Sequence, residues 1–440
     1  MNFPSSGQQS SSFLCLSVGC ITFLILLINV SFKIILWEGL VFTTSSIVCP
    51  LIAGLYLLAL RNCTFKEQRH LLNSSLMGLY LFCIGVFILV NLPASEYMHD
   101  NPVYQIIFND LPKKFFATTI SFVISFYLPH WIFCSESSTV LESPKQCVLL
   151  AVSGGLSFFC FNFYFLFAGP HAHNFQQIFI DSFMVSLLLS LIIAIVYLSF
   201  LLDTKQGKKD AVAVNTRRMI FPLYHYLIFF AVIVMLMCLS CEYRIIAFGK
   251  DNILTASCIF FPITMIVSSI LCELWGYQAH LKLIAALIGA QLLFDSFLMG
   301  VAVFPSPNFL NLNPFYNYII PRRLPAASLS LLVTFLTNSL VLHYFQRSKW
   351  QVPRWARIAL ANICASSLLC FVDYSLLFWG IYPYEQVINL AMHVWNYKLI
   401  TTALFLPVTL WLCKLLEKDK VFLLPRSPAT ELTKIPQSLR

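Results

Sequence analysis

A few ionisable side chains lie inside otherwise apolar segments of this 440-residue chain. They are Asp181, Glu273, Asp295, Asp373 and Lys398, together with His130, His225 and His393. Such a group costs roughly 2.5–3.5 kcal/mol at the centre of a bilayer on insertion scales, so each is a candidate for a functional role. Buried carboxylates can hold a proton, a cationic amine or a pair of N–H donors. The sequence therefore places its chemistry inside the membrane.

Asp373 and Lys398 stand on successive apolar segments, where a charge pair across the connecting turn is expected. Two roles stay open for them: a neutralised pair that joins two helices, or a site for substrate or a proton. Glu273 ends its own segment, and its structural and functional interpretations are equally balanced. The histidines lack any metal-binding spacing and the fifteen cysteines include no C-x-x-C, so we predict no metal, no cofactor and no catalytic residue.

A basic pair, Arg322-Arg323, follows Asn313-Pro314-Phe315-Tyr316 and is expected just before a helix on the outer face of the membrane. Basic residues are disfavoured on that face, which makes the pair a functional candidate. Aromatic residues make up 15% of the chain. Most must face lipid or the membrane interface, but some could stack on a planar ligand: Phe261, Trp355, Tyr374 and Trp379.

The composition requires a bilayer around these residues. The chain is 59% hydrophobic and 11% charged, whereas soluble domains carry roughly 25% charged residues. We predict an all-α polytopic membrane protein with about twelve transmembrane helices. The expected spans are 12–33, 39–60, 71–93, 115–134, 146–168, 176–202, 221–241, 252–272, 282–304, 324–345, 358–381 and 387–413.

The chain repeats itself at an offset of about 212 residues. Asn101-Pro102-Val103-Tyr104 returns as Asn313-Pro314-Phe315-Tyr316, and each copy is followed by a basic pair, Lys113-Lys114 and Arg322-Arg323. Self-similarity over this length indicates a duplicated domain. Six helices in each copy mean that both copies enter the membrane from the same side, so the two six-helix repeats are parallel.

This organisation predicts five parts. Residues 1–38 hold an N-terminal tail and the first helix, and 39–202 hold the rest of a first, degenerate repeat. Residues 203–218 form a basic cytoplasmic linker, 219–413 the second repeat, and 414–440 a cytoplasmic tail. Residues 1–11 contain no Lys or Arg, so the first helix is expected to be retained rather than cleaved.

The distribution of Lys and Arg gives the orientation. With a cytoplasmic N-terminus, 20 of the 28 fall in cytoplasmic segments and 7 on the opposite face, so both termini are expected inside. The net charge of +9 therefore reflects topology, and nucleic acid is not an expected partner. No phosphate-binding G-x-x-x-x-G-K-[ST] motif is present, although an ATPase supplied by a partner remains open.

The second repeat, about 250–413, resembles the YhhQ-type family of queuosine-precursor and vitamin uptake transporters (the VUT family). The stretches that carry the resemblance are Phe261 to Thr264 with Glu273, Trp275 and Gly276; Pro321 to Ser328; Ser366 to Asp373; and Lys398 with Pro407. Ser269 and Tyr374 depart from the family pattern, where Asp and Thr are usual. The first repeat keeps few of these polar residues, so the chain looks like a covalent pseudo-dimer.

The resemblance implies import of queuine or another 7-deazaguanine base into a bacterial cytoplasm through the inner membrane. The predicted partners are this small-molecule substrate and membrane lipid. The residues expected to bind the base are Glu273, Arg322, Arg323, Asn338, Asp373, Trp379 and Lys398. Glu273 and Asp373 would accept its N–H or amine donors, while Asn338 and the arginines would contact its remaining polar edge.

Two other functions stay open at this stage. One is a membrane-embedded enzyme that acts on a lipid or lipid-linked group, and the other is a scaffold subunit whose catalytic partner lies elsewhere. An enzyme would need a catalytic constellation near one membrane interface, and the sequence shows none. We therefore predict a transporter that is not an enzyme.

The expected topology can be tested with reporter fusions at residue 210 and at the C-terminus. Because cytoplasmic segments hold most of the basic residues, both fusions should report the cytoplasmic face. An extracellular signal from either fusion would contradict the arrangement.

Overall fold

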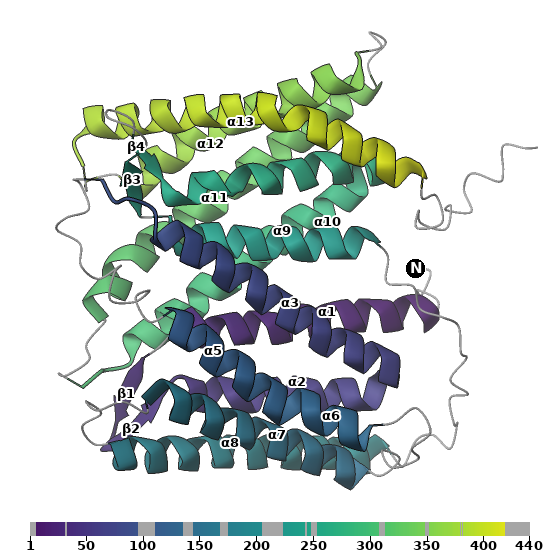
Figure 1. Cartoon of the computed structure of the whole chain (residues 1–440), viewed down its shortest axis with the longest axis vertical. Helices are drawn as coiled ribbons and strands as arrows, with labels where there is room; N and C mark the ends of the chain where they lie inside the picture. The colour runs from purple at the N-terminus through teal and green to yellow at the C-terminus, as the bar shows by residue number, and fades with distance from the viewer. Residues whose placement is uncertain are drawn as a thin grey trace, which may run out of the picture.

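A computed structural model describes residues 6–30, 33–95, 111–134, 144–167, 175–204, 223–242, 244–247, 253–307, 313–347, 352–378, 380 and 382–418. The chain is a bundle of long apolar helices, as predicted, and ten of the described helices are long and apolar enough to cross a membrane. The helices lie roughly parallel, with the N-terminal half below and the C-terminal half above in Figure 1.

The N-terminal half runs from residue 6 to 204. Its elements are α1 (Ser6–Val30), β1 (Ile34–Trp37), β2 (Leu40–Thr43), α2 (Ser45–Asn62), α3 (Phe65–Val90), α5 (Leu111–Phe122), the π-helical turn η2 (Val123–Tyr127), α6 (Leu128–Phe133), α7 (Pro144–Phe167) and α8 (Phe175–Thr204). α5, η2 and α6 follow one another without a break and form a single span.

The C-terminal half runs from residue 223 to 418. Its elements are α9 (Leu223–Ser240), β3 (Ile245–Ala247), β4 (Ile253–Thr255), the 3₁₀ turn η4 (Ala256–Ile259), α10 (Phe261–Val303), α11 (Asn313–Arg347), α12 (Arg354–Leu377) and α13 (Tyr384–Lys418). The first turn of α1 and the last turn of α13 lie on the same side of the bundle, at the right of Figure 1.

α10 consists of two helices joined at a kink. A straight helix of its 43 residues would be about 65 Å long, more than twice the ~30 Å apolar core of a bilayer. The break falls at Gly276, whose φ of 80° and ψ of −177° place it in a backbone region that is essentially restricted to glycine. With its two arms, 261–275 and 277–303, and with α1, each of the twelve predicted spans overlaps a helix.

Five predicted helix starts were wrong by six residues or more; those expected at 12 and 71 lie earlier, at Ser6 and Phe65. The helices expected from 39 and 252 begin at Ser45 and Phe261, because the preceding residues pair as the hairpins β1–β2 and β3–β4. Their β-branched and aromatic residues suit strands. The helix expected from 324 begins at Asn313, with Pro314 in its first turn, where proline is tolerated. Arg323 therefore lies inside α11 rather than in a loop before it.

Several predicted features fall outside the described residues. They include the first Asn-Pro-Val-Tyr copy, the linker beyond residue 204 and the tail beyond residue 418. The second Asn-Pro-Phe-Tyr copy begins α11, but its side chains are also outside the described set. The domain boundaries stay a prediction.

The hairpin region of each half makes hydrogen bonds to the other half. At the start of the first hairpin, Lys33 donates from Nζ to the backbone carbonyl of Phe304 at 2.6 Å. At the start of the second, Arg244 donates from Nη2 to the carbonyl of Leu92 at 2.8 Å. Lys33 and Arg244 are 211 residues apart, and Leu92 and Phe304 are 212 apart. Each half thus contacts the other at residues separated by nearly the same offset in the sequence.

The adjoining backbone repeats this exchange. Leu36 donates its N–H to the carbonyl of Pro305 at 2.9 Å, and Ala247 donates to the carbonyl of Pro93 at 3.0 Å. Both hairpins lie at the left edge of Figure 1, on the side opposite the described helix termini of α1 and α13. The contacts are reciprocal, as in an interface that relates two copies by a twofold axis.

Each hairpin is also fixed within its own half by a side chain of the last helix. Asp181 of α8 accepts the N–H of Val41 at 2.9 Å, and His393 of α13 accepts the N–H of Ile253 at 3.3 Å. Both residue pairs are 212 positions apart. These two ionisable residues therefore have a structural task in the described chain.

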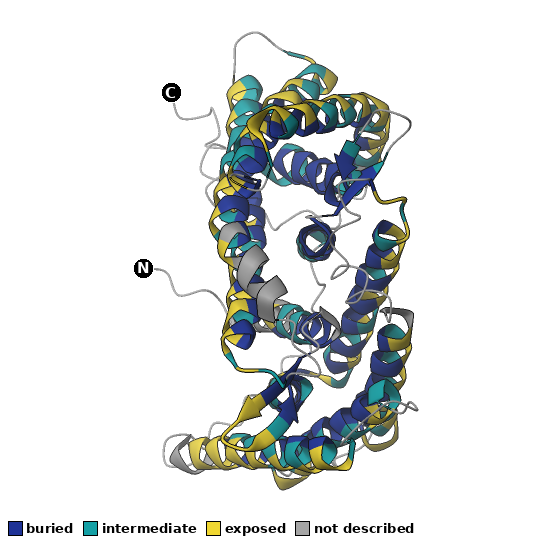
Figure 2. Ribbon diagram, turned by 90° about the vertical axis from the view of Figure 1, so that its left-hand side faces the viewer, coloured by how far each residue is buried: buried dark blue, intermediate teal, exposed yellow. Residues whose placement is uncertain are grey.

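Buried side chains line the inside of each half and exposed ones cover its outer faces (Figure 2). The exposed faces carry many large apolar residues, such as Met77, Ile84, Leu188 and Ile195. A face of this kind is suited to lipid, since acyl chains are as apolar as these side chains.

Replacing Gly276 with alanine should destabilise the protein by about 1–3 kcal/mol, because a Cβ is disfavoured in its backbone region. Gly300→Ala is the matched control on the same helix, since a Cβ there meets nothing within 4 Å. Thermal unfolding in detergent measures both. Equal melting temperatures would contradict the kinked backbone.

Candidate functional site

Three buried ionisable residues of the C-terminal half, Glu242, Asp373 and Lys398, lie together where α9, η4, α10, α11, α12 and α13 meet. A cavity of about 30 Å³ lies among them. Its polar lining comes from six residues: Glu242, Ser257, Ser330, Asp373, Tyr374 and Lys398. We call this the carboxylate cavity. It brings together residues that are up to 156 positions apart in the sequence.

Asp373 is placed by α12, whose opposite face points outward, and it is 6% exposed. Ser330 of α11 donates from Oγ to Asp373 Oδ1 at 2.7 Å. Glu242 shares a side-chain hydrogen bond with Asp373, and Lys398 acts on it electrostatically. Two carboxyl groups in direct contact cannot both stay ionised in an apolar interior, so one of them carries a proton.

Glu242 is the second carboxyl of this pair. It follows the end of α9 and is 7% exposed. Burial raises the pKa of its carboxyl well above the ordinary value, and the charge of Asp373 raises it further. Burial and the neighbouring carboxylate therefore favour the protonated form of Glu242, and a protonated carboxyl can donate to Asp373.

Lys398 of α13 reaches the carboxylate cavity from the other side. Its Nζ lies 4.7 Å from the centre of the Phe261 ring and 6.0 Å from that of Tyr374. No ion pair within 4 Å joins it to Asp373, both of which are described residues. The ammonium is thus stabilised by ring faces and by a carboxylate at longer range.

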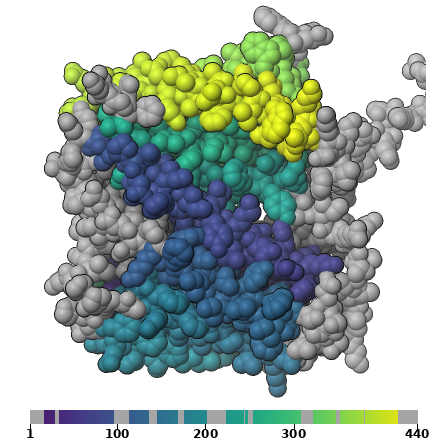
Figure 3. Space-filling view, in the orientation of Figure 1, coloured from purple at the N-terminus to yellow at the C-terminus, as the bar shows by residue number. Residues whose placement is uncertain are grey.

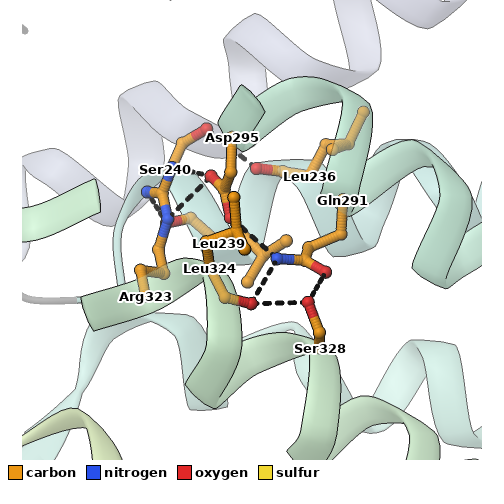
Figure 4. Close-up of polar contacts among 8 residues, drawn as sticks. All are labelled: Leu236, Leu239, Ser240, Gln291, Asp295, Arg323, Leu324 and Ser328. Carbon is orange, nitrogen blue, oxygen red and sulfur yellow. Dashed lines mark hydrogen bonds and ion pairs between the residues drawn. The ribbon is translucent and has the colours of Figure 1, made fainter. Parts of the chain in front are cut away.

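Arg323 has a different position from the one expected. Its Nε donates to Asp295 Oδ1 at 2.9 Å, Nη2 pairs with the same carboxylate, and Nη1 donates to the carbonyl of Leu239 at 3.1 Å. Gln291 donates to the second oxygen of Asp295 at 2.8 Å and accepts from Ser328 at 2.8 Å. Figure 4 shows Asp295 between Arg323 and Gln291.

The Arg323–Asp295 pair is 5% and 0% exposed, and it joins α11 to α10 and, through Leu239, to α9. Its donors and acceptors are engaged within the protein, so it acts as a clamp beside the carboxylate cavity. Breaking a buried pair of this kind by removing one partner costs about 3–5 kcal/mol.

Asn338 lies in a third buried group, further along α11. Its Nδ2 donates to Asn362 Oδ1 at 2.8 Å, and its Oδ1 accepts from Ser268 at 3.2 Å. Ser268 also bonds His280 at 2.5 Å, and Ser269 donates to Asn362 at 3.1 Å. All of these side chains are at most 6% exposed. We call them the amide group; they cross-link both arms of α10 to α11 and α12.

A second, smaller cavity is lined by residues of both regions. It measures about 10 Å³ and is lined by Asn362, Ser366, Thr401, Thr402, Thr409 and Lys398, with apolar residues of α10 and α13. Lys398 is therefore the one polar residue that lines both this space and the carboxylate cavity among the described residues. On α13, the polar residues that line the smaller cavity all follow Lys398: Thr401, Thr402 and Thr409.

Glu273 is placed at the far end of this half, where the first arm of α10 ends. Arg357 donates to both of its oxygens, at 2.8 Å each, and Arg354 lies 3.4 Å away. Arg354 also pairs with Glu417 of α13 at 2.5 Å. The Glu273 side chain is 1% exposed. These four residues, the arginine gate, tie α10, α12 and α13 together.

The seven predicted site residues thus do not form one site. The structure brings Asp373 and Lys398 to one cavity, places Arg323 in a clamp beside it, and places Asn338 and Glu273 in the amide group and the arginine gate. The Arg322 side chain and Trp379 lie outside the described residues. Whether each of the five described residues binds substrate stays a prediction.

The sequence did not single out Glu242, Ser330 or Gln291. Glu242 follows the end of an apolar segment, in Ser240-Cys241-Glu242-Tyr243-Arg244, and such a position ordinarily suggests an exposed residue. It is buried because the chain turns back here into the hairpin β3–β4. Among the described residues, no group of three or more His, Cys, Asp and Glu is arranged to hold a metal ion.

Residues 255–412 match the model of the family described as "Putative vitamin uptake transporter". The matched stretch includes Asp373, Lys398 and the arginine gate apart from Glu417, while Glu242 lies before it. No curated protein and no solved structure matches the chain. The match supports transport across the membrane as the role of this region.

Asp295→Asn and Arg323→Gln should each destabilise the protein by about 3–5 kcal/mol, because each leaves a buried charge without its partner. The double variant should regain most of that loss, as a coupled pair requires. Arg354→Gln is the control: its side chain is 33% exposed, and its removal should cost about 1 kcal/mol or less. Additive losses on thermal unfolding would show that Arg323 and Asp295 do not depend on each other.

Proposed function

We propose that this chain is a carrier that imports a queuosine precursor, queuine or another 7-deazaguanine base, through its C-terminal half. One observation carries the proposal: the side chains of Glu242, Asp373 and Lys398 surround one cavity that the rings of Phe261 and Tyr374 also line. The family match supports uptake as the activity. Transport rather than catalysis is the role we assign.

The chemistry of the cavity suits such a base. A deazaguanine presents two adjacent N–H donors, which one carboxylate can accept as a pair, and Asp373 is the carboxylate available. Its planar face can stack on Phe261 or Tyr374, which lie on the two sides of Lys398. Lys398 can donate to the carbonyl oxygen of the base. A cationic amine on the precursor would form an ion pair with Glu242 once that carboxyl loses its proton.

The structure represents a closed state of the proposed carrier. A cavity of about 30 Å³ has room for about two water molecules and is too small for a base. Binding therefore requires α13 to move away from α10 and α12. Pro407 weakens α13 for such a movement, because proline cannot donate to the carbonyl four residues earlier.

We assign Lys398 the position between an outer and an inner compartment. The carboxylate cavity lies near the hairpin, and the 10 Å³ cavity lies on the side of the amide group. Opening one compartment while the other stays closed would give alternating access around a fixed site. In this scheme the arginine gate closes the far end, and Glu273 acts by holding three helices rather than by contacting the base.

We further propose that the two halves are tandem copies, so the chain is a fused pseudo-dimer. The reciprocal hairpin contacts and the Asp181 and His393 bonds at equivalent positions support this. A further pair supports it too: Asn162 donates to Thr118 at 3.2 Å where the C-terminal half has Asp373 and Ser330. The equivalent of the proposed binding carboxylate is thus an amide.

The proposed location is the bacterial inner membrane, with both termini cytoplasmic. The neutral Glu242 beside Asp373 makes proton coupling compatible with the site. Energy from an ATPase partner would require a cytoplasmic docking surface, and the basic linker at 203–218 is the segment of predicted cytoplasmic position that could supply one.

Uptake of labelled queuine into inverted or right-side-out vesicles tests the proposal. Asp373→Asn and Glu242→Gln should each lower initial uptake at least tenfold while the protein still reaches the membrane, because each changes the proton and donor pattern of the carboxylate cavity. Asn162→Ser is the control, since it changes the neutral counterpart in the N-terminal half and should retain most uptake.

Absence of queuine uptake by the wild-type protein, in vesicles where it is folded and abundant, would contradict the substrate. Equal losses in all three variants would contradict the assignment of the site to the C-terminal half. Restoration of queuosine in the tRNA of a host that lacks its synthesis and transport provides the same comparison in cells.

A further inference from the structure

A large apolar groove lies at the junction of the two halves, away from the carboxylate cavity. It has a volume of about 1010 Å³ and is lined by α1, α2, α8, α9 and the second arm of α10, with Ser74 from α3. The lining is almost entirely aliphatic and aromatic. Small residues of α10, among them Ala286 and Gly289, form part of one wall, and Ile193, Val196 and Phe200 of α8 form part of another.

The groove exists because the two sides of the junction pack differently. On one side, α3 packs directly on α9; it crosses the boundary between the halves diagonally in Figures 1 and 3. The approach is so close that a Cβ at Gly85 would lie 1.7 Å from Met237 Sδ. On the other side, the ring of Phe23 in α1 lies beside that of Phe294 in the second arm of α10, with their centroids 6.0 Å apart. Both helices line the open groove.

Basic residues stand at one end of this groove. Arg61, the residue before the last of α2, lies with its guanidinium 5.8 Å from the ring of Tyr197. Lys282, early in the second arm of α10, lies with Nζ 5.7 Å from the ring of Tyr224. Tyr197 and His225 both line the groove. His225 interacts electrostatically with Lys282. Arg61 and Lys282 are both exposed.

We propose that the groove binds one phospholipid with an anionic headgroup. Its acyl chains would lie along the apolar lining, and its phosphate would lie between Arg61 and Lys282. In a bilayer this groove can be filled only by something as apolar as lipid, and an apolar cavity of ~150 Å³ already holds a benzene molecule. The observed volume is roughly seven times that figure, which gives room for acyl chains.

The charge of the site selects the headgroup. Arg61 and Lys282 place two cations at the groove end, and the predicted topology puts that end on the cytoplasmic side, where anionic lipids attract basic residues. The bound lipid would fill the gap between the two halves and hold them together opposite the α3–α9 contact. The inference rests on membrane residence and does not depend on which solute the protein carries.

Lipid titration of the detergent-purified full chain, followed by native mass spectrometry, tests the proposal. The probes are dioleoyl phosphatidylglycerol and dioleoyl phosphatidylcholine. The wild-type protein should bind one phosphatidylglycerol at least tenfold more tightly than phosphatidylcholine. Replacing both cations, Arg61→Gln with Lys282→Gln, should reduce the affinity for phosphatidylglycerol to that for phosphatidylcholine.

A matched pair of glycine variants tests the groove itself. Gly289 lines the groove and Gly300 does not, yet both lie in the second arm of α10 and a Cβ at either meets nothing within 4 Å. Gly289→Leu should fill part of the groove and weaken binding of both lipids at least tenfold. Gly300→Leu should leave binding unchanged. Both changes favour helix, so folding should persist in each.

Three results would overturn the proposal. They are equal affinity of the wild-type protein for the two lipids, unchanged lipid binding in Gly289→Leu, and a stable dimer of the wild-type chain that Gly289→Leu dissociates. The last would show that a second copy of the chain, rather than lipid, occupies the groove.

Discussion

The cost of holding charge inside a bilayer shapes the C-terminal half. Its buried ionisable residues are each compensated in a different way. Asp295 has a full ion pair with Arg323, and Glu273 has two arginines. Asp373 has the carboxyl of Glu242 and the hydroxyl of Ser330 beside it, with Lys398 at longer range against aromatic rings. The first two arrangements are complete within the protein. The third leaves acceptors and donors facing a cavity, and for that reason we assign it to the substrate.

The halves share a frame and differ in polarity. Equivalent hairpins, equivalent bonds from Asp181 and His393, and reciprocal contacts of Lys33 and Arg244 give the frame. In the proposed tandem arrangement, the carboxylate of the C-terminal half corresponds to Asn162 in the N-terminal half. A neutral amide needs no counter-charge, so the N-terminal half can keep its packing without a polar cavity. In the proposed pseudo-dimer one copy transports and the other supports it.

Hydropathy predicted the helices because a span needs about 20 apolar residues whatever its tertiary contacts. Among the starts that it misplaced are those of α2, α10 and α11. β2 and β4 are as apolar as the helices that follow them, and α11 begins with the turn-like pair Asn313-Pro314. Asp373 and Lys398 could be found from their cost in the membrane. Glu242 could not, because its burial comes from the return of the chain at β3. Arg323 and Glu273 looked free for a ligand because their partners, Asp295, Arg354 and Arg357, are far away in the sequence or unremarkable in it.

The central claim is that the carboxylate cavity is the substrate site. It is tested most directly by cryo-electron microscopy of the protein in lipid with saturating queuine. The account predicts density for the base against Asp373 and the ring of Phe261, with Lys398 within hydrogen-bonding distance and α13 displaced from α10. Density in the N-terminal half, or beside Glu273 with the carboxylate cavity still closed, would contradict it.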